Sequence, residues 1–300
     1  MHLFDLHADT ATKLFYNGLS FDDPTLQLSA NDLSAFEEVH QVFACFSNKR
    51  LDDEQVFLDF FAMRNRLLSQ LVPYRKAGLS PILAVEDARL LGKKRDRLRM
   101  LAEAGVAILT LVWKGETQIG GAFDTHVGLS EFGRTILSDC FSCGIIPDAS
   151  HASVPTFFEI AEAAEQSRAP FIASHSNSRV IADHPRNLTD DQFRAVKHAH
   201  GIVGVSLCPA HLRTDGEADL SDVALHIEHW LSLGGEETVA IGTDFDGIDS
   251  LPRGISHCRD LIRLAEILSR QGYNDSLIEK IFYKNAESFF GKYRKKQEPL

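Results

Sequence analysis

The chain has 300 residues, of which 44% are hydrophobic, and its 31 basic and 42 acidic residues give a formal net charge of −11. This charge disfavours nucleic acid as a partner, because phosphate backbones are bound by basic surfaces. No apolar run approaches the length of a membrane span, and the N-terminus lacks the pattern of a signal peptide, so no membrane partner is expected. The five cysteines are odd in number and scattered, which fits reduced thiols and a cytoplasmic protein.

Short apolar runs recur along the chain, and most are followed by a polar turn and then by a helical pattern. Most of them are rich in Val, Ile, Leu or Phe and too short for helices, as expected of parallel strands buried on both faces. In chain order the eight runs cover residues 3–6, 39–46, 81–85, 106–112, 144–148, 170–173, 201–207 and 238–242.

Amphipathic helical patterns occupy the intervals between these runs. In residues 55–72, for example, apolar residues that include Phe57 and Phe60 recur on a helical period. Further helices are expected over residues 131–141, 154–165, 189–198 and 221–233, with two more after the last strand, over residues 256–270 and 274–290.

Eight strand–helix units predict a (β/α)8 TIM barrel, an α/β fold, and residues 1–300 are expected to form one domain because such barrels routinely use this length. An open, doubly wound sheet is the runner-up. Such a sheet usually binds a nucleotide through a glycine-rich first turn, and no G-x-G-x-x-G follows the first strand here. In a barrel, the C-terminal ends of the strands form the active face.

Residues able to bind a metal ion follow most of the expected strands. His7 and Asp9 end the first strand two residues apart, so their side chains share a face. The others, at the ends of later strands, are Glu86, His151, His175 and Asp244. Any one of them has an ordinary explanation, as a hydrogen-bonded loop residue or a helix cap. Their common position after apolar runs predicts a single cluster at the mouth of the barrel.

Three imidazoles and three carboxylates suit a pair of divalent metal ions better than one ion. Zinc takes about four ligands, and a catalytic zinc leaves a position open for water. Two metals ~3.5–4 Å apart need a bridging group, which Glu86 can supply. A bridging water would be acidified and act as the nucleophile, and Asp244 could pass its proton to a leaving amine. The predicted reaction class is metal-assisted hydrolysis of an amide or related bond.

Short motifs surround these residues and extend over nearly the whole chain. They are Asp5-Leu6-His7-Ala8-Asp9, Val85-Glu86-Asp87, Asp148-Ala149-Ser150-His151-Ala152-Ser153, Ser167-Arg168-Ala169-Pro170, Ser174-His175-Ser176, Arg186-Asn187 and Gly242-Thr243-Asp244-Phe245-Asp246-Gly247. Each motif is weak alone, but in combination the chain resembles the membrane dipeptidase (renal dipeptidase) family of zinc metallopeptidases, in its bacterial form.

The resemblance implies a dipeptidase with two zinc ions as cofactors, other divalent metals being the alternative. It implies that His7, Asp9 and Glu86 hold one zinc. It also implies that Glu86, together with His151 and His175, holds the second.

The same resemblance implies roles for two further residues and a homodimer. Asp244 would be the proton shuttle. Arg186 would bind the terminal carboxylate of a dipeptide substrate, a task suited to a planar bidentate donor. From the residues alone, Arg186 would be interpreted as a surface charge.

One position departs from the mammalian members of the family, which have a substrate-contacting histidine after the fourth strand. Here Trp113 stands at that place and is followed by Lys114-Gly115-Glu116, as in a bacterial subgroup. A histidine can donate to the oxyanion of a tetrahedral intermediate, and an indole N–H can also donate, with a different reach. Trp113 is therefore expected to contact substrate, and the alternative is packing at the barrel rim.

The expected function is zinc-dependent hydrolysis of dipeptides by a metal-bridging hydroxide, and whether a C-terminal D-residue is accepted stays open. A second hypothesis is hydrolysis of another amide, a lactam or a lactone on the same site, since fold does not fix substrate. A third is a non-catalytic binding barrel, which the full ligand set disfavours.

Other polar features have plainer interpretations. His226 and His229 lie three apart in an expected helix and, with Trp230, are interpreted as an outer helix face. His184 and His211 are expected on loops of the active face. The polar residues 292–297 are expected to fray.

Overall fold

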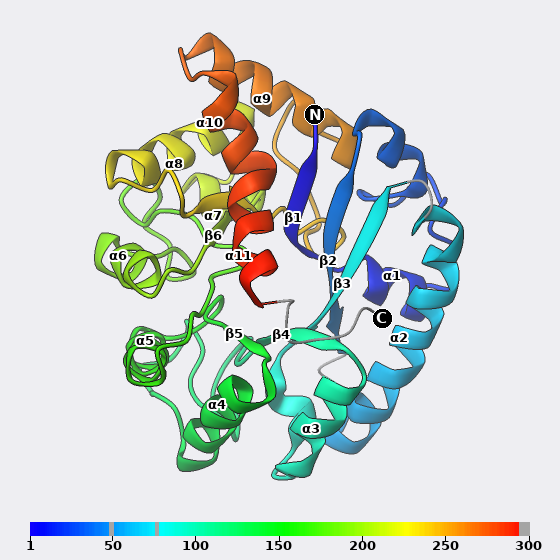
Figure 1. Ribbon diagram of the computed structural model, residues 1–300, viewed down its shortest axis with the longest axis vertical. Helices are drawn as coiled ribbons and strands as arrows, with labels where there is room; N and C mark the ends of the chain where they lie inside the picture. Colours follow the sequence, from blue (N-terminus) through cyan, green and yellow to red (C-terminus); the bar gives the residue numbers. More distant parts are fainter. Residues whose placement is uncertain (48–50, 76–77, 294–300) are drawn as a thin grey trace.

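The structure, a computed structural model, describes residues 1–47, 51–75 and 78–293. Within these residues, seven parallel strands form one curled sheet surrounded by helices (Figure 1). The strands are β1 (Leu3–Ala8), β2 (Val39–Phe46), β3 (Leu79–Glu86), β4 (Val106–Thr110), β5 (Ile146–Asp148), β6 (Val203–Val205) and β7 (Val239–Ile241). Their order in the sheet is β5-β4-β3-β2-β1-β7-β6.

A two-residue link closes this sheet into a ring. Ile172 pairs with Asp148 at the end of β5, and Ala173 pairs with Val203 at the start of β6, each through a single parallel bridge. The expected (β/α)8 barrel is thereby confirmed, although the sixth apolar run forms only this link and no regular strand. Pro170, which has no N–H to donate to a neighbouring strand, limits the pairing at the start of the run.

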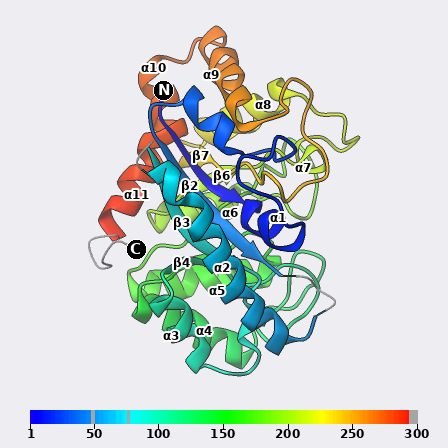
Figure 2. The same cartoon turned by 90° about the vertical axis from the view of Figure 1, so that its right-hand side faces the viewer.

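Apolar side chains from alternate strand positions fill the barrel. They include Phe4, Leu6, Val42, Ala44, Ile82, Ala84, Ile108, Ile146, Ile172, Ile202 and Ala240. Helix α11 (Asn285–Tyr293) adds Phe289 and Phe290 to this cluster, and the Phe290 ring stacks on Phe4 with centroids 5.1 Å apart. Figure 2 shows α11 on the left, where the strands begin, and α1 (Thr10–Tyr16) on the right, where they end. Helix α11 thus covers the end of the barrel where the strands begin, and loops surround the end where the strands finish.

The remaining helices form the outer layer. They are α2 (Asp53–Arg75), α3 (Asp96–Glu103), α4 (Glu131–Cys143), α5 (Val154–Ser167), α6 (Asp190–His198), α7 (Pro209–Leu212), α8 (Leu220–Ser232), α9 (Leu261–Arg270) and α10 (Asp275–Glu279). Shorter 3-10 turns cover Ala30–Ala35, Ala88–Leu91 and Cys258–Asp260, and a π turn at Lys280–Lys284 joins α10 to α11. The five helices expected between strands are confirmed as α2, α4, α5, α6 and α8, whereas the last two are each divided into shorter pieces.

The start of α6 illustrates how the sequence sets these boundaries. Thr189 accepts a hydrogen bond from the N–H of Gln192 at 3.2 Å, and the Gln192 side chain accepts one from the N–H of Thr189 at 2.9 Å. This capping box satisfies two N–H groups that the first turn leaves unpaired. Asp190 and Asp191 occupy the same turn, where the helix dipole favours negative charge.

The face of α8 that carries His226 and Trp230 is buried, so its interpretation as an outer face is wrong. Both side chains are 0% exposed, and Trp230 stacks on Phe193 of α6 with centroids 4.3 Å apart. The core accepts His226 because its Nδ1 accepts a hydrogen bond from the N–H of Ser178 at 2.9 Å and its Nε2 donates to the carbonyl of Leu212 at 3.0 Å.

None of the helices in the described part of the chain combines the length and the apolar character that crossing a bilayer requires. Residues 294–297, on which most of the expected fraying falls, lie outside the described residues.

Candidate metal centre and substrate pocket

The six residues expected at strand ends lie together at the C-terminal end of the barrel. Their ligand atoms form three groups, and within each group all of these atoms lie within 4.8 Å of one another. The groups are His7, Asp9 and Glu86; Glu86, His151 and His175; and His7, His175 and Asp244. Because the groups share members, they form one continuous cluster.

Glu86, at the end of β3, lies at the centre of this cluster. Its Oε1 is 3.0 Å from Nε2 of His151, 3.5 Å from Nε2 of His175 and 3.8 Å from Nε2 of His7. Nε2 of His7 is also 3.4 Å from Oδ2 of Asp9. Glu86 thus faces three imidazoles from different segments of the chain. This is the position that a carboxylate bridging two cations would occupy.

Two of these residues have a strained backbone. His151 has a φ of 67° and Asp244 a φ of 66°, in the left-handed region that residues other than glycine rarely adopt. Asp87, directly after Glu86, has a φ of 75°. Such conformations persist only where the surrounding structure holds them, and they concentrate at functional sites.

A buried carboxylate beneath the cluster holds two of its segments together. Asp5 accepts hydrogen bonds from the N–H and the hydroxyl of Thr243, at 2.8 and 2.7 Å, and from the side-chain amide of Gln41 at 3.0 Å. Burial raises the pKa of Asp5 although these bonds oppose the rise. The register between β1 and β2 shifts by one residue between Asp5 and Ala8, the stretch that contains His7.

The donor set fits divalent metal ions. Nδ1 of His151 donates to the carbonyl of Trp113 at 3.0 Å, so a neutral imidazole directs the lone pair of its Nε2 toward Nε2 of His175, 2.9 Å away, and toward Glu86. Buried lone pairs in such contact repel one another unless a proton or a cation lies between them. Among the described residues, Nε2 of His7 and Oδ1 of Asp9 are also buried without a hydrogen-bond partner. Imidazole and carboxylate are ligands that zinc accepts.

The charges within the cluster shift the pKa values of its members in opposite directions. Burial raises the pKa of Glu86 well above its usual range and raises the pKa of Asp244 to about 7. Burial alone would lower the pKa of His7, but the neighbouring carboxylates, Glu86 foremost, raise it to about 10. Burial lowers the pKa of both His151 and His175 well below the usual range. Such opposed shifts in one cleft are typical of functional sites.

A cavity of about 460 Å³ opens over the cluster. Its wall includes Asp9, Glu86, His151 and Asp244, together with Thr12, Lys13, Asn17, Phe46, Trp113, Lys114, Phe123, His184, Arg186, Cys208, His211, Asp246, Gly247 and Ile248. Position 247 in this wall requires glycine, because a Cβ there would overlap the carboxylates of Asp9 and Asp244. The volume and the mixture of aromatic and polar groups suit a small polar molecule.

Arg186 lies in the cavity wall and is only 5% exposed, so its interpretation as a surface charge is wrong. Its guanidinium carbon lies 5.8 Å from the centroid of the Phe123 ring. In the described structure, its Nε and Nη2 are buried without a hydrogen-bond partner. Two unpaired donors on one buried guanidinium can receive a carboxylate in bidentate fashion.

Trp113 lines the cavity and also packs against the cluster. Its ring stacks on His151 with centroids 5.7 Å apart and contacts the Phe46 ring at a tilt, with centroids 5.0 Å apart. Trp113 therefore packs near the rim and also faces the cavity, and its contact with substrate stays a prediction.

The cavity also contains residues that no motif identified. Phe123 lies in a loop away from the expected strand ends, whereas Cys208 directly follows the expected strand over residues 201–207, and no motif singled out either residue. His184 and His211, expected on such loops, do line the cavity, with ring centroids 4.7 Å apart. Burial lowers the pKa of His211 to about 2.

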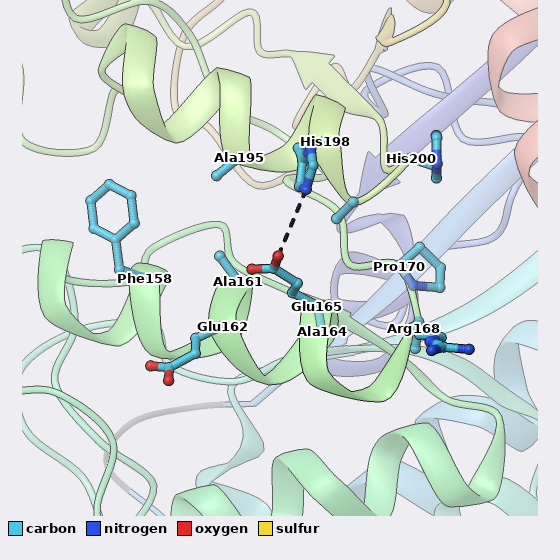
Figure 3. A pocket seen from close by; sticks show the side chains of 12 residues that line it. Phe158, Ala161, Glu162, Ala164, Glu165, Arg168, Pro170, Ala195, His198 and His200 are labelled. Carbon is cyan, nitrogen blue, oxygen red and sulfur yellow. Dashed lines mark ion pairs between the residues drawn. The ribbon is translucent and has the colours of Figure 1, made fainter.

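A second cavity, of about 500 Å³, lies on the outer layer between α5 and α6 (Figure 3). Its lining includes several alanines, and Nε2 of His198 lies 3.9 Å from Oε1 of Glu165 in its wall. None of the strand-end residues lines this cavity. Candidate metal ligands therefore line the cavity at the barrel mouth and not this second cavity.

A parallel α/β barrel with imidazoles and carboxylates clustered at its C-terminal strand ends defines a class of protein, the metal-dependent hydrolases. The comparison with known families places the chain within this class. A model of the family described as Membrane dipeptidase (Peptidase family M19) matches residues 71–298. The chain belongs to this family and is a hydrolase of the metallo-dipeptidase type.

Curated relatives agree with this assignment. Dipeptidase aclJ of Aspergillus oryzae is 34% identical over 209 residues, which are 67% of this chain and 48% of that protein. Dipeptidase 3 of Rattus norvegicus is 30% identical over 220 residues, which are 71% of this chain and 44% of that protein. The chain thus spans about half the length of these two relatives. A Klebsiella pneumoniae protein, described only as lying in the pqqA 5' region, is 33% identical over 206 residues, 65% of this chain and 74% of its own length.

Solved structures match over the whole fold. The dipeptidase AC, a metallopeptidase of the same family, superposes with a TM-score of 0.90 at 26% identity and covers 98% of each chain. A metallopeptidase from Rhodobacter sphaeroides, liganded with a phosphinate mimic of the dipeptide L-Ala-D-Ala, superposes with a TM-score of 0.88 at 25% identity and covers 98% of this chain and 99% of its own.

Proposed function

We propose that the chain is a zinc-dependent dipeptidase whose site holds two zinc ions. His7, Asp9 and Glu86 would hold one ion, and Glu86, His151 and His175 the other. The observation that carries this proposal is the shared carboxylate, since Glu86 belongs to both ligand groups and each group lies within 4.8 Å. When bound, such a metal pair polarises a carbonyl group and makes a bound water nucleophilic at neutral pH.

Arg186 would orient the dipeptide by binding its terminal carboxylate. The guanidinium is buried in the cavity wall with two unpaired donors, so it needs little reorganisation to accept an anion. The site is selective for short substrates, because a longer peptide would place an uncharged amide where the guanidinium requires a negative group.

Asp244 would move the proton of the reaction. It lies in the same cavity as Arg186 and has ligand atoms close to His7 and His175. Burial raises the pKa of Asp244 to about 7, which suits a group that accepts a proton and then donates it to the leaving amine near neutral pH.

The aromatic wall would enclose the substrate and limit the access of water. The rings of Trp113 and Phe46 contact one another at a tilt in this wall, and Phe123 lies beside Arg186. We include dipeptides with a C-terminal D-residue among the substrates, and the support for this is the L-Ala-D-Ala mimic bound by the Rhodobacter sphaeroides neighbour. A carboxylated lactam is the second candidate substrate, because it also offers an anion to Arg186, whereas a neutral lactone does not.

A substrate panel tests this proposal directly. The enzyme, prepared with zinc, would be assayed on L-Ala-L-Ala, on L-Ala-D-Ala, on the corresponding dipeptide amides, on a carboxylated lactam and on a neutral lactone. We expect hydrolysis of the free dipeptides, much weaker hydrolysis of the amides, and loss of activity on chelation that added zinc reverses. Efficient turnover of the neutral lactone with none of the dipeptides would contradict the proposal.

We also propose that residues 1–300 form one domain, that the chain forms a homodimer, and that it works in the cytoplasm. All five cysteines are free thiols in the structure, which supports a reducing compartment. Light scattering of the purified protein tests the homodimer, and cell fractionation tests the location.

A further inference from the structure

The hydroxyl of Ser174 lies where three buried side chains meet. Its Oγ is 2.6 Å from Oδ2 of Asp148, 2.8 Å from Nδ1 of His175 and 3.3 Å from Nδ1 of His7. Ser174, Asp148 and both histidines are each 1% exposed. The four groups are therefore shielded from bulk solvent, and their hydrogen bonds are made within the protein.

The Ser174 hydroxyl has a single hydrogen, and it donates this hydrogen in a hydrogen bond to the carboxylate of Asp148. Asp148 also accepts hydrogen bonds from the hydroxyl of Thr110 at 2.7 Å and from the N–H groups of Ser150 and Ser174, both at 2.9 Å. Every one of these contacts places a donor on a carboxylate oxygen, so Asp148 acts as the acceptor throughout. The Ser174 O–H therefore points to Asp148, and its oxygen is left to accept from the Nδ1–H groups of the two histidines.

This proton arrangement decides which ring nitrogen each histidine offers to a metal. With Nδ1 protonated, the lone pair of a neutral imidazole is on Nε2, and both Nε2 atoms face Glu86, at 3.5 Å from His175 and 3.8 Å from His7. A metal-bound histidine usually donates its other N–H to an oxygen in this way. His151 is different, because its Nδ1 donates to a backbone carbonyl, that of Trp113.

We propose that Ser174, oriented by Asp148, is a positioning residue that sets the metal-binding tautomer of one histidine in each of the two ligand sets. This inference rests on the proposed binuclear site. One hydroxyl would then prepare both metal positions at once, His7 for the first ion and His175 for the second.

The backbone around Ser174 is built to hold it in place. A Cβ at Gly204, in β6, or at Gly242, just after β7, would overlap the carbonyl oxygen of Ser174. Glycine at both positions allows the end of β6, the end of β7 and the Ser174 segment to approach one another closely. The hydroxyl is therefore fixed relative to the histidines by packing as well as by hydrogen bonds.

The test compares Ser174→Ala with Ser176→Ala. Ser176 is a buried serine two residues away whose Oγ lies 3.5 Å from Oγ of Ser150 and, among the described hydrogen bonds, makes none to the ring of His7 or His175. Zinc affinity would be measured by competition with a chromophoric chelator, and folding of the metal-free proteins by circular dichroism. We expect Ser174→Ala to weaken binding of both ions by about 10- to 100-fold, while Ser176→Ala binds zinc as the wild type does.

A second measurement uses the wild-type protein and does not depend on whether the variant folds. Nitrogen-15 NMR of the zinc-loaded protein distinguishes protonated from unprotonated ring nitrogens. Protonated Nδ1 in both His7 and His175 is the expected result, and a protonated Nε2 in either would overturn the inference.

The outcomes separate this inference from the proposed function. Equal zinc affinity in Ser174→Ala and wild type would overturn the role of Ser174 while the dipeptidase proposal stands, provided that the wild type binds zinc and hydrolyses dipeptides. A wild type that binds no zinc would overturn the proposed function, and the role of Ser174 with it.

Discussion

The carbonyl oxygen of Trp113 accepts a hydrogen bond from Nδ1 of His151 at 3.0 Å, and the two rings stack with their planes 28° apart. The backbone of Trp113 therefore fixes the tautomer of a candidate zinc ligand, while its side chain forms the wall of the substrate cavity. The two roles can be separated, because substitution of the side chain leaves the carbonyl in place.

Replacement of Trp113 by phenylalanine is expected to change substrate use more than metal binding. The carbonyl that orients His151 remains, and the smaller ring still packs, so zinc content should stay at the wild-type level. Aromatic contacts of this kind contribute about 0.5–1.5 kcal/mol, which predicts a fall in kcat/KM of roughly 2- to 10-fold. Elemental analysis and steady-state kinetics check both parts, and loss of zinc from the folded variant would contradict the division of roles.

Replacement of Arg186 by methionine should remove the preference for a free terminal carboxylate. A hydrogen-bonded charge contributes about 1.5–3 kcal/mol, so kcat/KM for a dipeptide should fall roughly 10- to 150-fold while that for its amide changes little. Arg194→Met, which removes an exposed arginine that pairs with Asp191 on α6, is the matched control. An equal loss on the acid and the amide would argue against the anchor.

Replacement of Asp244 by asparagine keeps the size of the side chain but removes its ability to carry a proton. General acid–base catalysis contributes about 10²–10⁴-fold, so kcat should fall by that factor with zinc retained. Asp249→Asn, in the exposed part of the same loop, should keep wild-type activity. If Asp244→Asn loses zinc together with activity, its role is that of a ligand and not of a proton carrier.

The buried His226 predicts a pH dependence of stability. Burial lowers its pKa from 6.5 to about 4, so below pH 6.5 the unfolded chain binds a proton that the folded chain resists. Stability is complete above pH 6.5 and is lost as the pH falls toward 4, by about 3 kcal/mol in total. A proton on Nδ1 would also prevent that nitrogen from accepting the N–H of Ser178.

This dependence is measured as the free energy of unfolding in urea between pH 4 and 7 on chelated protein. His226→Gln, which cannot titrate, should show a shallower slope than the wild type in this range. His198→Gln, on an exposed side chain of α6, is the control and should keep the wild-type slope. Equal slopes in His226→Gln and wild type would refute the explanation.

Much of the site could be predicted from the sequence because parallel strands bring their C-terminal ends to one edge. His7, Glu86 and His175 are far apart in the chain, but each lies within two residues of the end of an apolar run, and that position alone predicts their proximity. The metal-ligand cluster therefore follows from strand order and needs no knowledge of side-chain packing.

Other features could not be predicted because they depend on long-range packing. Arg186 lies in a loop, and nothing local distinguishes a buried guanidinium from an exposed one. His226 is buried because backbone groups of Ser178 and Leu212, distant in the chain, satisfy both of its ring nitrogens. The sixth apolar run likewise forms no regular strand, because it is joined to its neighbours only by single bridges, from Ile172 to Asp148 and from Ala173 to Val203.

The measurement that tests the central claim most directly is the zinc content of the purified protein, determined by elemental analysis alongside hydrolysis of L-Ala-D-Ala, for the wild type and Glu86→Gln. We predict about two zinc ions per wild-type chain, and loss of both metal and activity in the variant, because one carboxylate serves both ligand sets. A wild type that hydrolyses dipeptides without bound metal, or a Glu86→Gln variant that keeps two zinc ions, would contradict the account of a shared-carboxylate site.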